Sequence, residues 1–215
     1  MKAAVAATPI QEGGVRGFLH APAGAERGIA LTHGAGGNCE APLLVAVATA
    51  LCEAGLCVLR CDLPFRQERR SGPPRPGDAA ADRHGLRQAA AFLRTRVPGD
   101  VFLGGHSYGG RQASMLAAEA PELAHGLLLL SYPLHPPNKP AQLRTNHFPS
   151  LETPIVFVHG SADPFGTIPE MEAALKLIPA VKRLLVVGGA GHDLRRGKFD
   201  MAAMVDTLTG ERREI

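Results

Sequence analysis

A serine between two glycines is the first feature of the chain whose residue types could do chemistry. The segment "FLGGHSYGGRQAS", residues 102–114, places Ser107 two positions after Gly105 and two positions before Gly109. The chain has only six serines and 25 glycines among 215 residues, so this spacing is rare by chance. An apolar run precedes the serine, and a helix-like segment follows it. Glycine-x-serine-x-glycine in that context indicates a nucleophilic serine on a sharp turn, where bulkier neighbours would collide.

A serine hydroxyl becomes an effective nucleophile when a histidine takes its proton and a carboxylate orients that histidine. For a serine on such a turn, the expected chain order is serine, acid, histidine. Asp163 in "VHGSADPFG" and His192 in "GGAGHDL" follow in this order, each directly after an apolar run. Either residue alone could be an ordinary turn or loop residue, but their joint order and placement favour a catalytic set. We predict Ser107 as the nucleophile, Asp163 as the acid and His192 as the base.

Four other residues compete for the roles of acid and base. Asp193 could serve as the acid, although it is adjacent to His192 and neighbouring side chains tend to diverge. Three further histidines could serve as the base: His33, His106 and His159. His33 precedes the serine in the chain, whereas His106 is held next to it within the turn. We rank all four below the pair named above.

The tetrahedral intermediate of acyl transfer also needs backbone amides that bind its oxyanion. One donor should be the N–H of Tyr108, the residue after the predicted nucleophile. The other should come from the glycine-rich segment "LTHGAGGN", residues 31–38, in which Ala35 is the candidate. A phosphate-binding loop is the rival interpretation of this segment, but neither of the usual glycine-rich phosphate patterns is present.

Short apolar runs that end in turn residues organise the rest of the chain. They cover residues 28–34, 55–62, 100–107, 124–133, 153–160 and 182–189. Continuous runs of this length are typical of parallel strands buried on both faces. Helices are expected between them at residues 40–54, 78–96, 108–120, 168–178 and 198–209. The alternation predicts an α/β fold with a mostly parallel, doubly wound sheet flanked by helices.

Three details complete the expected organisation. Asp78 should be the N-cap of the helix over residues 78–96. Residues 3–22 should add an antiparallel pair of strands that turns at Gly13 and Gly14. Residues 1–215 are long enough for one substantial core, so we expect a single domain.

Two stretches rich in proline and arginine, residues 63–77 and 132–150, follow strand ends and should border the ligand crevice. The second contains no long apolar helix, so we expect little or no cap over an open site. In the first, Arg69 and Arg70 are candidates to contact an acidic substrate, although a solvated charged loop is the better interpretation of such a run. Arg111 is expected to be a structural anchor.

Composition excludes several other classes of function. The net charge of +3 does not indicate a nucleic-acid-binding protein, and no apolar run approaches the length of a membrane span. The opening "MKAAVAATPI" is unlike a secretory signal, so we expect a cytoplasmic protein. Four cysteines form no metal-binding pattern and are expected to be buried thiols: Cys39, Cys52, Cys57 and Cys61. No metal or cofactor is predicted.

The motifs together resemble the α/β-hydrolase superfamily. More narrowly, "LTHGAGGN", "GGHSYGGR", "SYPLHPPNKP", "VHGSADPFG" and "GAGHDL" resemble small bacterial hydrolase-like proteins related to a domain of testis-expressed and histone-acetyltransferase-complex proteins. The resemblance spans roughly residues 28–209 and implies an eight-stranded hydrolase fold with the same nucleophile, acid and base. Relatives often carry arginine immediately before the serine, where this chain has His106. Some members look like scaffolds within complexes.

We therefore predict a serine hydrolase that cleaves small soluble esters or thioesters through an acyl-enzyme on Ser107. The alternative is a non-catalytic α/β-hydrolase-like interaction module. Peptidase activity is disfavoured because nothing in the chain suggests a peptide-binding domain. Haloalkane and epoxide chemistry is disfavoured because relatives of that kind use aspartate at the nucleophile position. The sequence predicts a small-molecule partner and leaves the oligomeric state open.

Overall fold

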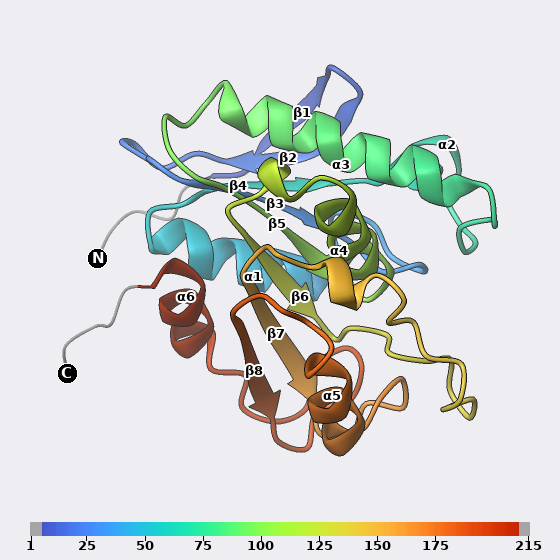
Figure 1. Cartoon of the computed structure of the whole chain (residues 1–215). Helices are drawn as coiled ribbons and strands as arrows, with labels where there is room; N and C mark the ends of the chain where they lie inside the picture. The colour runs from blue at the N-terminus through green and yellow to red at the C-terminus, as the bar shows by residue number, and fades with distance from the viewer. Residues whose placement is uncertain (1–5, 211–215) are drawn as a thin grey trace.

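The computed structural model describes residues 6–210, whose strands form one eight-stranded sheet in the order β1-β2-β4-β3-β5-β6-β7-β8 (Figure 1). The strands are β1 (Thr8–Glu12), β2 (Val15–His20), β3 (Gly28–Thr32), β4 (Cys57–Cys61), β5 (Val101–His106), β6 (Gly126–Leu130), β7 (Ile155–Gly160) and β8 (Lys182–Val187). β2 pairs antiparallel with β1 and with β4, and all remaining pairs are parallel. The predicted α/β-hydrolase fold with its mostly parallel sheet is confirmed.

Helices cover both faces of the sheet. They are α1 (Pro42–Glu53), α2 (Pro64–Glu68), α3 (Asp78–Arg94), α4 (Tyr108–Glu119), α5 (Ile168–Leu175) and α6 (Met201–Thr209), with short 3-10 helices η1 (Pro121–Leu123) and η2 (Phe148–Ser150). α1 and α6 pack on one face, and α3, α4 and α5 pack on the other. The two hydrophobic layers enclose the sheet, so its central strands meet no water on either face.

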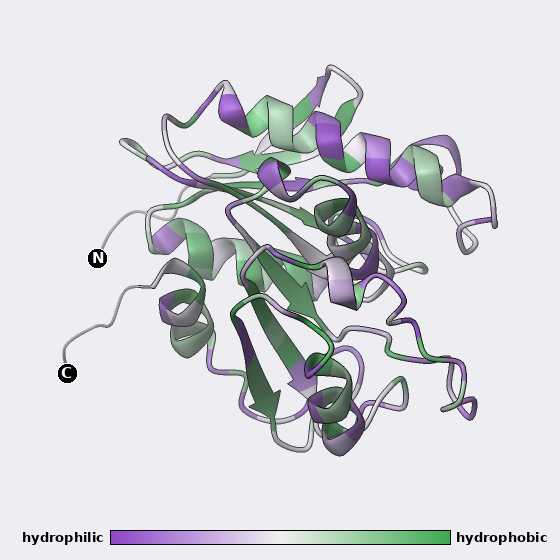
Figure 2. Cartoon of the chain, in the orientation of Figure 1, coloured by the Kyte–Doolittle hydropathy of each residue, from purple (hydrophilic) through white to green (hydrophobic). Residues whose placement is uncertain are grey.

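The alternation of side chains along each strand explains why the central strands read as continuous apolar runs. In β6, Leu128 and Leu130 belong to the hydrophobic cluster with α1 and α6, whereas Leu127 and Leu129 belong to the cluster with α3 and α4. Successive side chains of a strand point to opposite faces, so both sets must be apolar when both faces are covered. Figure 2 shows hydrophobic residues along the central strands and hydrophilic residues on the outer side of α3.

β8 departs from the expectation of a strand buried on both faces. It is the last strand of the sheet, and no other described strand pairs with its outer edge. The side chain of Val186 is consequently 48% exposed, and Arg183 is also exposed. Hydropathy alone did not distinguish this edge strand from the central ones.

Residues 63–77, for which the sequence predicted no helix, contain a short one. This helix is α2, whose first residue is Pro64, a position where proline costs no helical hydrogen bond. The N-cap of α3 is Gly77, so the prediction of Asp78 as the N-cap is wrong by one residue. Asp78 begins the helix instead, and its carboxylate accepts the backbone N–H of Arg75 at 2.7 Å.

The strand order brings the loops with chemical residues together. β3 and β5 are neighbours, as are β7 and β8, and all four strands run parallel. The loops after these strands therefore lie at the same carboxyl edge of the sheet, where ligands bind in open α/β folds. Among the described helices, none combines the length and hydropathy needed to cross a membrane.

Close contact between β5 and β6 requires glycine at position 104. A Cβ atom there would lie 2.4 Å from the backbone oxygen of Leu128. We expect Gly104→Ala to lower the free energy of unfolding by about 1–3 kcal/mol, because the backbone of β6 must shift. Urea unfolding monitored by circular dichroism would measure the change. Gly77→Ala is the control, since no atom lies within 4 Å of its Cβ position, and an equal loss in both variants would contradict the explanation.

Candidate active site

Ser107 occupies a strained turn between β5 and α4. Its backbone angles, φ 51° and ψ −113°, are rarely adopted by residues other than glycine. The turn is held by a hydrogen bond from the Ser107 N–H to Leu130 O of β6 at 2.8 Å. The Arg111 N–H donates to Ser107 O at 2.9 Å and begins the helical hydrogen bonds. The side chain is thereby fixed at the carboxyl edge of the sheet.

The glycines on either side of the serine are required by the end of β3. A Cβ atom on Gly105 would lie 2.5 Å from Thr32 O, and one on Gly109 would lie 2.7 Å from His33 O. Real Cβ atoms do not approach carbonyl oxygens so closely. The sequence predicted steric crowding at these two positions, and the structure identifies β3 as the neighbour that causes it.

Three side chains from separate loops form one line of hydrogen bonds. The Ser107 Oγ lies 2.8 Å from His192 Nε2, and His192 Nδ1 lies 2.8 and 3.0 Å from the two carboxylate oxygens of Asp163. The Asp163 side chain is fully buried, whereas that of His192 is 21% exposed. With a carboxylate at Nδ1, the ring carries its proton there, and Nε2 accepts the hydrogen bond of the serine.

Phe165 supports this line from one side. Its ring lies 4.1 Å from that of His192, centroid to centroid, with 30° between the planes. Its backbone N–H donates to Asp163 Oδ1 at 2.8 Å. One residue therefore limits the rotation of the imidazole and also fixes the carboxylate.

The competing acid Asp193 and the competing base His159 have other contacts. The Asp193 side chain is 58% exposed, and its Oδ1 accepts the N–H of Arg195 at 3.1 Å. His159 is completely buried and donates from Nε2 to Gly166 O at 2.8 Å. Burial lowers the pKa of His159, so the ring is neutral at pH 7. Neither residue contacts Ser107.

His33 and His106 are also neutral residues whose hydrogen bonds go to the backbone. His33 donates from Nδ1 to Gly34 O at 2.8 Å and accepts the N–H of Leu63 at Nε2. Burial lowers its pKa. His106 donates from Nε2 to the carbonyl oxygen of His192 at 2.8 Å, and burial lowers its pKa to about 4. His106 thus holds the loop that carries His192, a role that the sequence did not indicate.

Two backbone amides next to the serine have no acceptor within residues 6–210: those of Ala35 and Tyr108. Gly34 O is turned toward its two donors, His33 Nδ1 and the N–H of Gly37. Because a trans peptide is planar, the Ala35 N–H points in the opposite direction from Gly34 O. The Tyr108 N–H is the first of α4, where an intrahelical acceptor does not exist.

The side chain of Tyr108 is anchored away from the serine. Its hydroxyl donates to Asp82 Oδ2 at 2.7 Å, and Asp82 Oδ1 accepts the N–H of Phe65 at 3.1 Å. Asp82 is completely buried, and this burial raises the pKa of its carboxyl group. The sequence analysis missed Asp82. Its spacing with Leu86 and Leu93, on the buried face of α3, was the available signal.

A cleft of about 390 Å³ contains Ser107 and His192 in its lining. Other lining residues are Gly34, Ala35, Gly36, Gly37, Ala41, Pro42, Leu43, His106, Phe165, Asp193 and Arg195. None of these falls within residues 132–150, whose only regular element in the structure is η2. Pro42, Leu43 and Phe165 give the cleft an apolar wall beside the reactive serine.

The structure does not bring Arg69 and Arg70 to this cleft. Arg69 forms an ion pair with Asp78, because α2 turns the chain back toward the start of α3. Arg70 is exposed, and neither residue is part of the lining. The arginine that does line the cleft is Arg195, which lies 3.5 Å from Asp193.

The described residues contain no group of three or more His, Cys, Asp or Glu side chains that could hold a metal ion. All four cysteines are buried and unpaired. Burial raises the pKa of Cys39 to about 12, so this thiol stays protonated at neutral pH.

Comparisons with known proteins show the family of the chain and similar folds. A family model described as an alpha/beta hydrolase domain matches residues 25–212. Dienelactone hydrolase from Anabaena variabilis is 25% identical, with 94% of each chain covered and a TM-score of 0.72. Est1E from Butyrivibrio proteoclasticus is 17% identical, with 95% of this chain and 96% of that chain covered and a TM-score of 0.72.

A serine hydrolase without a lid from Xanthomonas campestris is 17% identical, with 96% of this chain and 94% of that chain covered and a TM-score of 0.70. The likeness to this protein and to Est1E concerns the fold. None of the three structures represents the testis-expressed or acetyltransferase-complex proteins, so that narrower resemblance stays a prediction.

The hydrogen bond between Tyr108 and Asp82 should contribute measurably to the free energy of unfolding. Tyr108→Phe removes the only hydroxyl that donates to Asp82 Oδ2 among the described residues. We expect the free energy of unfolding to fall by about 1–3 kcal/mol, because a buried carboxylate oxygen loses its partner. In an Asp82→Ala background the same change should cost much less. Equal costs in both backgrounds, measured by urea unfolding, would contradict the contact.

Proposed function

The chain belongs to the alpha/beta hydrolase domain family, and we propose that it is a serine hydrolase acting on small esters or thioesters through an acyl-enzyme on Ser107. The observation that carries this proposal is the unbroken line from Ser107 through His192 to Asp163, located in an open cleft. We also propose that the chain acts as one domain, because all described strands belong to a single sheet.

In the first half of the reaction, Ser107 attacks the ester carbonyl. His192 Nε2 takes the hydroxyl proton while Oγ forms a bond to the carbonyl carbon. The carbonyl oxygen becomes an oxyanion that accepts hydrogen bonds from the N–H groups of Ala35 and Tyr108. Each of these hydrogen bonds lowers the activation free energy by about 3 kcal/mol. Asp163 accepts the Nδ1–H of His192 and stabilises the imidazolium that forms. The tetrahedral intermediate then collapses, and His192 gives its proton to the departing alcohol or thiol.

The second half of the reaction repeats these steps with water. His192 Nε2 takes a proton from water as its oxygen bonds to the acyl carbon. The same two amides bind the second oxyanion. Collapse breaks the bond to Ser107 Oγ, which recovers its proton from His192, and the carboxylic acid leaves. Each residue thus returns to its starting protonation state.

The shape of the cleft supports a short acyl group. Pro42, Leu43 and Phe165 provide apolar contact next to the serine, and no residue of the 132–150 segment covers the opening. One solved structure of Est1E carries ferulic acid, and the Anabaena relative is a dienelactone hydrolase, so proteins of this fold act on or bind small carboxylic compounds. Small esters and thioesters are the substrates that match both points.

Covalent labelling of the serine tests the proposal directly. The wild-type protein should react with a fluorophosphonate at Ser107 and hydrolyse p-nitrophenyl butyrate. Ser107→Ala should lose the label and nearly all turnover while keeping its circular dichroism spectrum, because no other nucleophile contacts His192 Nε2 among the described residues. If the wild-type protein is neither labelled nor active, the proposal is wrong and a non-catalytic interaction module becomes the better explanation.

The open cleft should limit the benefit of longer acyl chains. A buried methylene is worth about 0.8 kcal/mol, so kcat/KM should rise up to about 15-fold from p-nitrophenyl acetate to the butyrate. It should not rise further to the octanoate, whose outer methylenes stay in water. Steady-state kinetics across the series would measure this. A rise that continues to the octanoate would indicate a covered acyl channel and contradict the open cleft.

A further inference from the structure

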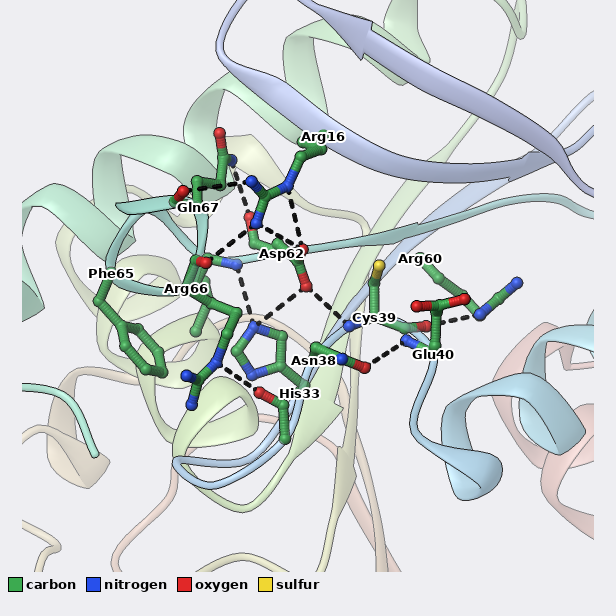
Figure 3. Close-up of polar contacts among 12 residues, drawn as sticks. Arg16, His33, Asn38, Cys39, Glu40, Arg60, Asp62, Phe65, Arg66 and Gln67 are labelled. Atoms are coloured by element: carbon green, nitrogen blue, oxygen red, sulfur yellow. Dashed lines mark hydrogen bonds and ion pairs between the residues drawn. The ribbon is translucent and has the colours of Figure 1, made fainter. Parts of the chain in front are cut away.

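Arg66 is a buried arginine that donates four hydrogen bonds, all of them to backbone carbonyl oxygens. It belongs to α2, is 4% exposed, and lies behind the glycine-rich loop that contains Ala35 (Figure 3). Its acceptors are Gly37 O at 2.7 Å, Gly72 O at 2.9 Å, Ala35 O at 3.0 Å and Arg69 O at 3.1 Å. In the part of the chain that the structure describes, no carboxylate lies within 4.0 Å of this guanidinium. The charge is therefore compensated by these carbonyl dipoles and by the ring of Phe65, whose centroid lies 4.9 Å from the guanidinium carbon.

Two of these four carbonyls belong to the loop that carries the proposed oxyanion donor. Arg66 holds Ala35 O and Gly37 O, while Gly34 O is held by His33 and by the Gly37 N–H. With the carbonyl oxygens of Gly34, Ala35 and Gly37 bound, the three peptide planes that contain them are not free to turn. The Ala35 N–H, which lies opposite Gly34 O in its peptide plane, is thereby kept without an internal acceptor.

The backbone of Arg66 is itself held by Arg16, which also forms an ion pair with Asp62. Arg16 donates from Nη2 to Arg66 O at 2.9 Å and from Nη1 to Gln67 O at 3.1 Å. The same guanidinium pairs with Asp62 Oδ2 at 2.9 Å. Asp62 Oδ1 accepts the N–H of Cys39, at the far end of the loop, at 2.8 Å. Figure 3 shows Arg16 of β2 directed toward Asp62, the residue after β4, and toward Arg66 and Gln67 of α2.

Loops of small residues have many accessible backbone conformations, and glycine adds to that freedom. Residues 34–37 read Gly-Ala-Gly-Gly and contain no side chain that could fix their own peptide planes. An oxyanion donor contributes to the rate only if it is already oriented when negative charge develops. Within the loop, the Gly37 N–H binds Gly34 O. From outside the loop, Arg66 supplies the hydrogen bonds to Ala35 O and Gly37 O, which hold two further peptide planes.

We propose that Arg66 is a positioning residue that holds the glycine-rich loop so that the Ala35 N–H faces the oxyanion. It does not contact the reacting atoms. This inference rests on the proposed hydrolase function and deepens it by assigning a role to an arginine that the fold alone does not require at this site. A residue of this kind should affect kcat rather than substrate binding, because the oxyanion exists only after attack.

Arg66→Met keeps the apolar stem and removes all five N–H donors. With p-nitrophenyl butyrate we expect kcat to fall by about 10- to 100-fold, less than the loss of a whole oxyanion donor, with KM within about twofold of wild type. Inhibition by phenylboronic acid, which forms a tetrahedral adduct on a catalytic serine, should weaken by a similar factor. Hydrogen exchange at the amides of Gly37 and Cys39 should accelerate, while that of α4 should not change.

Arg94→Met is the matched control. Arg94 also donates to two backbone carbonyls, those of Glu122 and Leu123, but it lies far from the cleft lining. It should keep wild-type kcat, KM and boronate affinity. If Arg66→Met does not fold, Arg66→Lys carries the test: an ammonium group cannot reproduce the fork of the guanidinium, so kcat should still fall with KM unchanged. Guanidinium chloride at low millimolar concentration should partly restore kcat in Arg66→Ala, whereas tetramethylammonium chloride should not.

The outcomes separate this inference from the proposed function. A wild-type protein that is inert and unlabelled at Ser107 overturns both. An active wild type with unchanged kcat in the Arg66 variants, or with a loss confined to KM, overturns the positioning role alone. A loss of kcat as large in Arg94→Met would have the same meaning. A selective loss of kcat and boronate affinity in the Arg66 variants, with faster exchange in the loop, supports it.

Discussion

The close approach of the turn at Ser107 to the end of β3 is the constraint on which the rest of the site depends. Gly105 and Gly109 allow it, because a Cβ atom at either position would meet the backbone or side chain of Thr32. The Gly109 N–H then donates to His33 O at 3.1 Å, which ties α4 to the loop after β3. The nucleophile and the glycine-rich loop are thus neighbours through backbone contact, before any catalytic side chain is considered.

Around this contact, side chains hold several carbonyl oxygens of the glycine-rich loop, while the amides of Ala35 and Tyr108 have no acceptor within residues 6–210. The carbonyls of the glycine-rich loop are bound by Arg66 and His33, and the loop ends where Asp62 accepts the Cys39 N–H. Buried polar groups without partners are costly, so a folded chain rarely leaves them. The amides of Ala35 and Tyr108 border the cleft instead, where a ligand or water can reach them. Donors that are already oriented toward a ligand are what electrostatic preorganisation requires.

The sequence was sufficient for the central strands, because these depend on local hydropathy. It also placed Ser107, Asp163 and His192 at strand ends, and the structure brings these three side chains within hydrogen-bond distance of one another, while their catalytic roles stay a proposal. It was insufficient where the environment of a charge decides its role. Arg66 and Arg69 belong to one basic run, yet one is buried against carbonyls and the other pairs with Asp78. The sequence analysis did not single out Asp82, whose partner Tyr108 is 26 positions away in the chain. The exposed edge of β8 likewise depends on strand order, which hydropathy does not encode.

Burial also explains why one histidine among several can act as the base. His33, His106 and His159 each donate one ring N–H to a backbone carbonyl, and burial lowers the pKa of all three. Carboxylate oxygens of Asp62 and Asp163 lie 3.7 Å from Nε2 of His33 and of His159, but burial outweighs their attraction and lowers the pKa of both rings. His192 differs because Asp163 accepts at Nδ1 and leaves Nε2 for the serine. His192 thus combines a carboxylate at one ring nitrogen with the serine hydroxyl at the other, which is the arrangement that the proposed proton transfer needs.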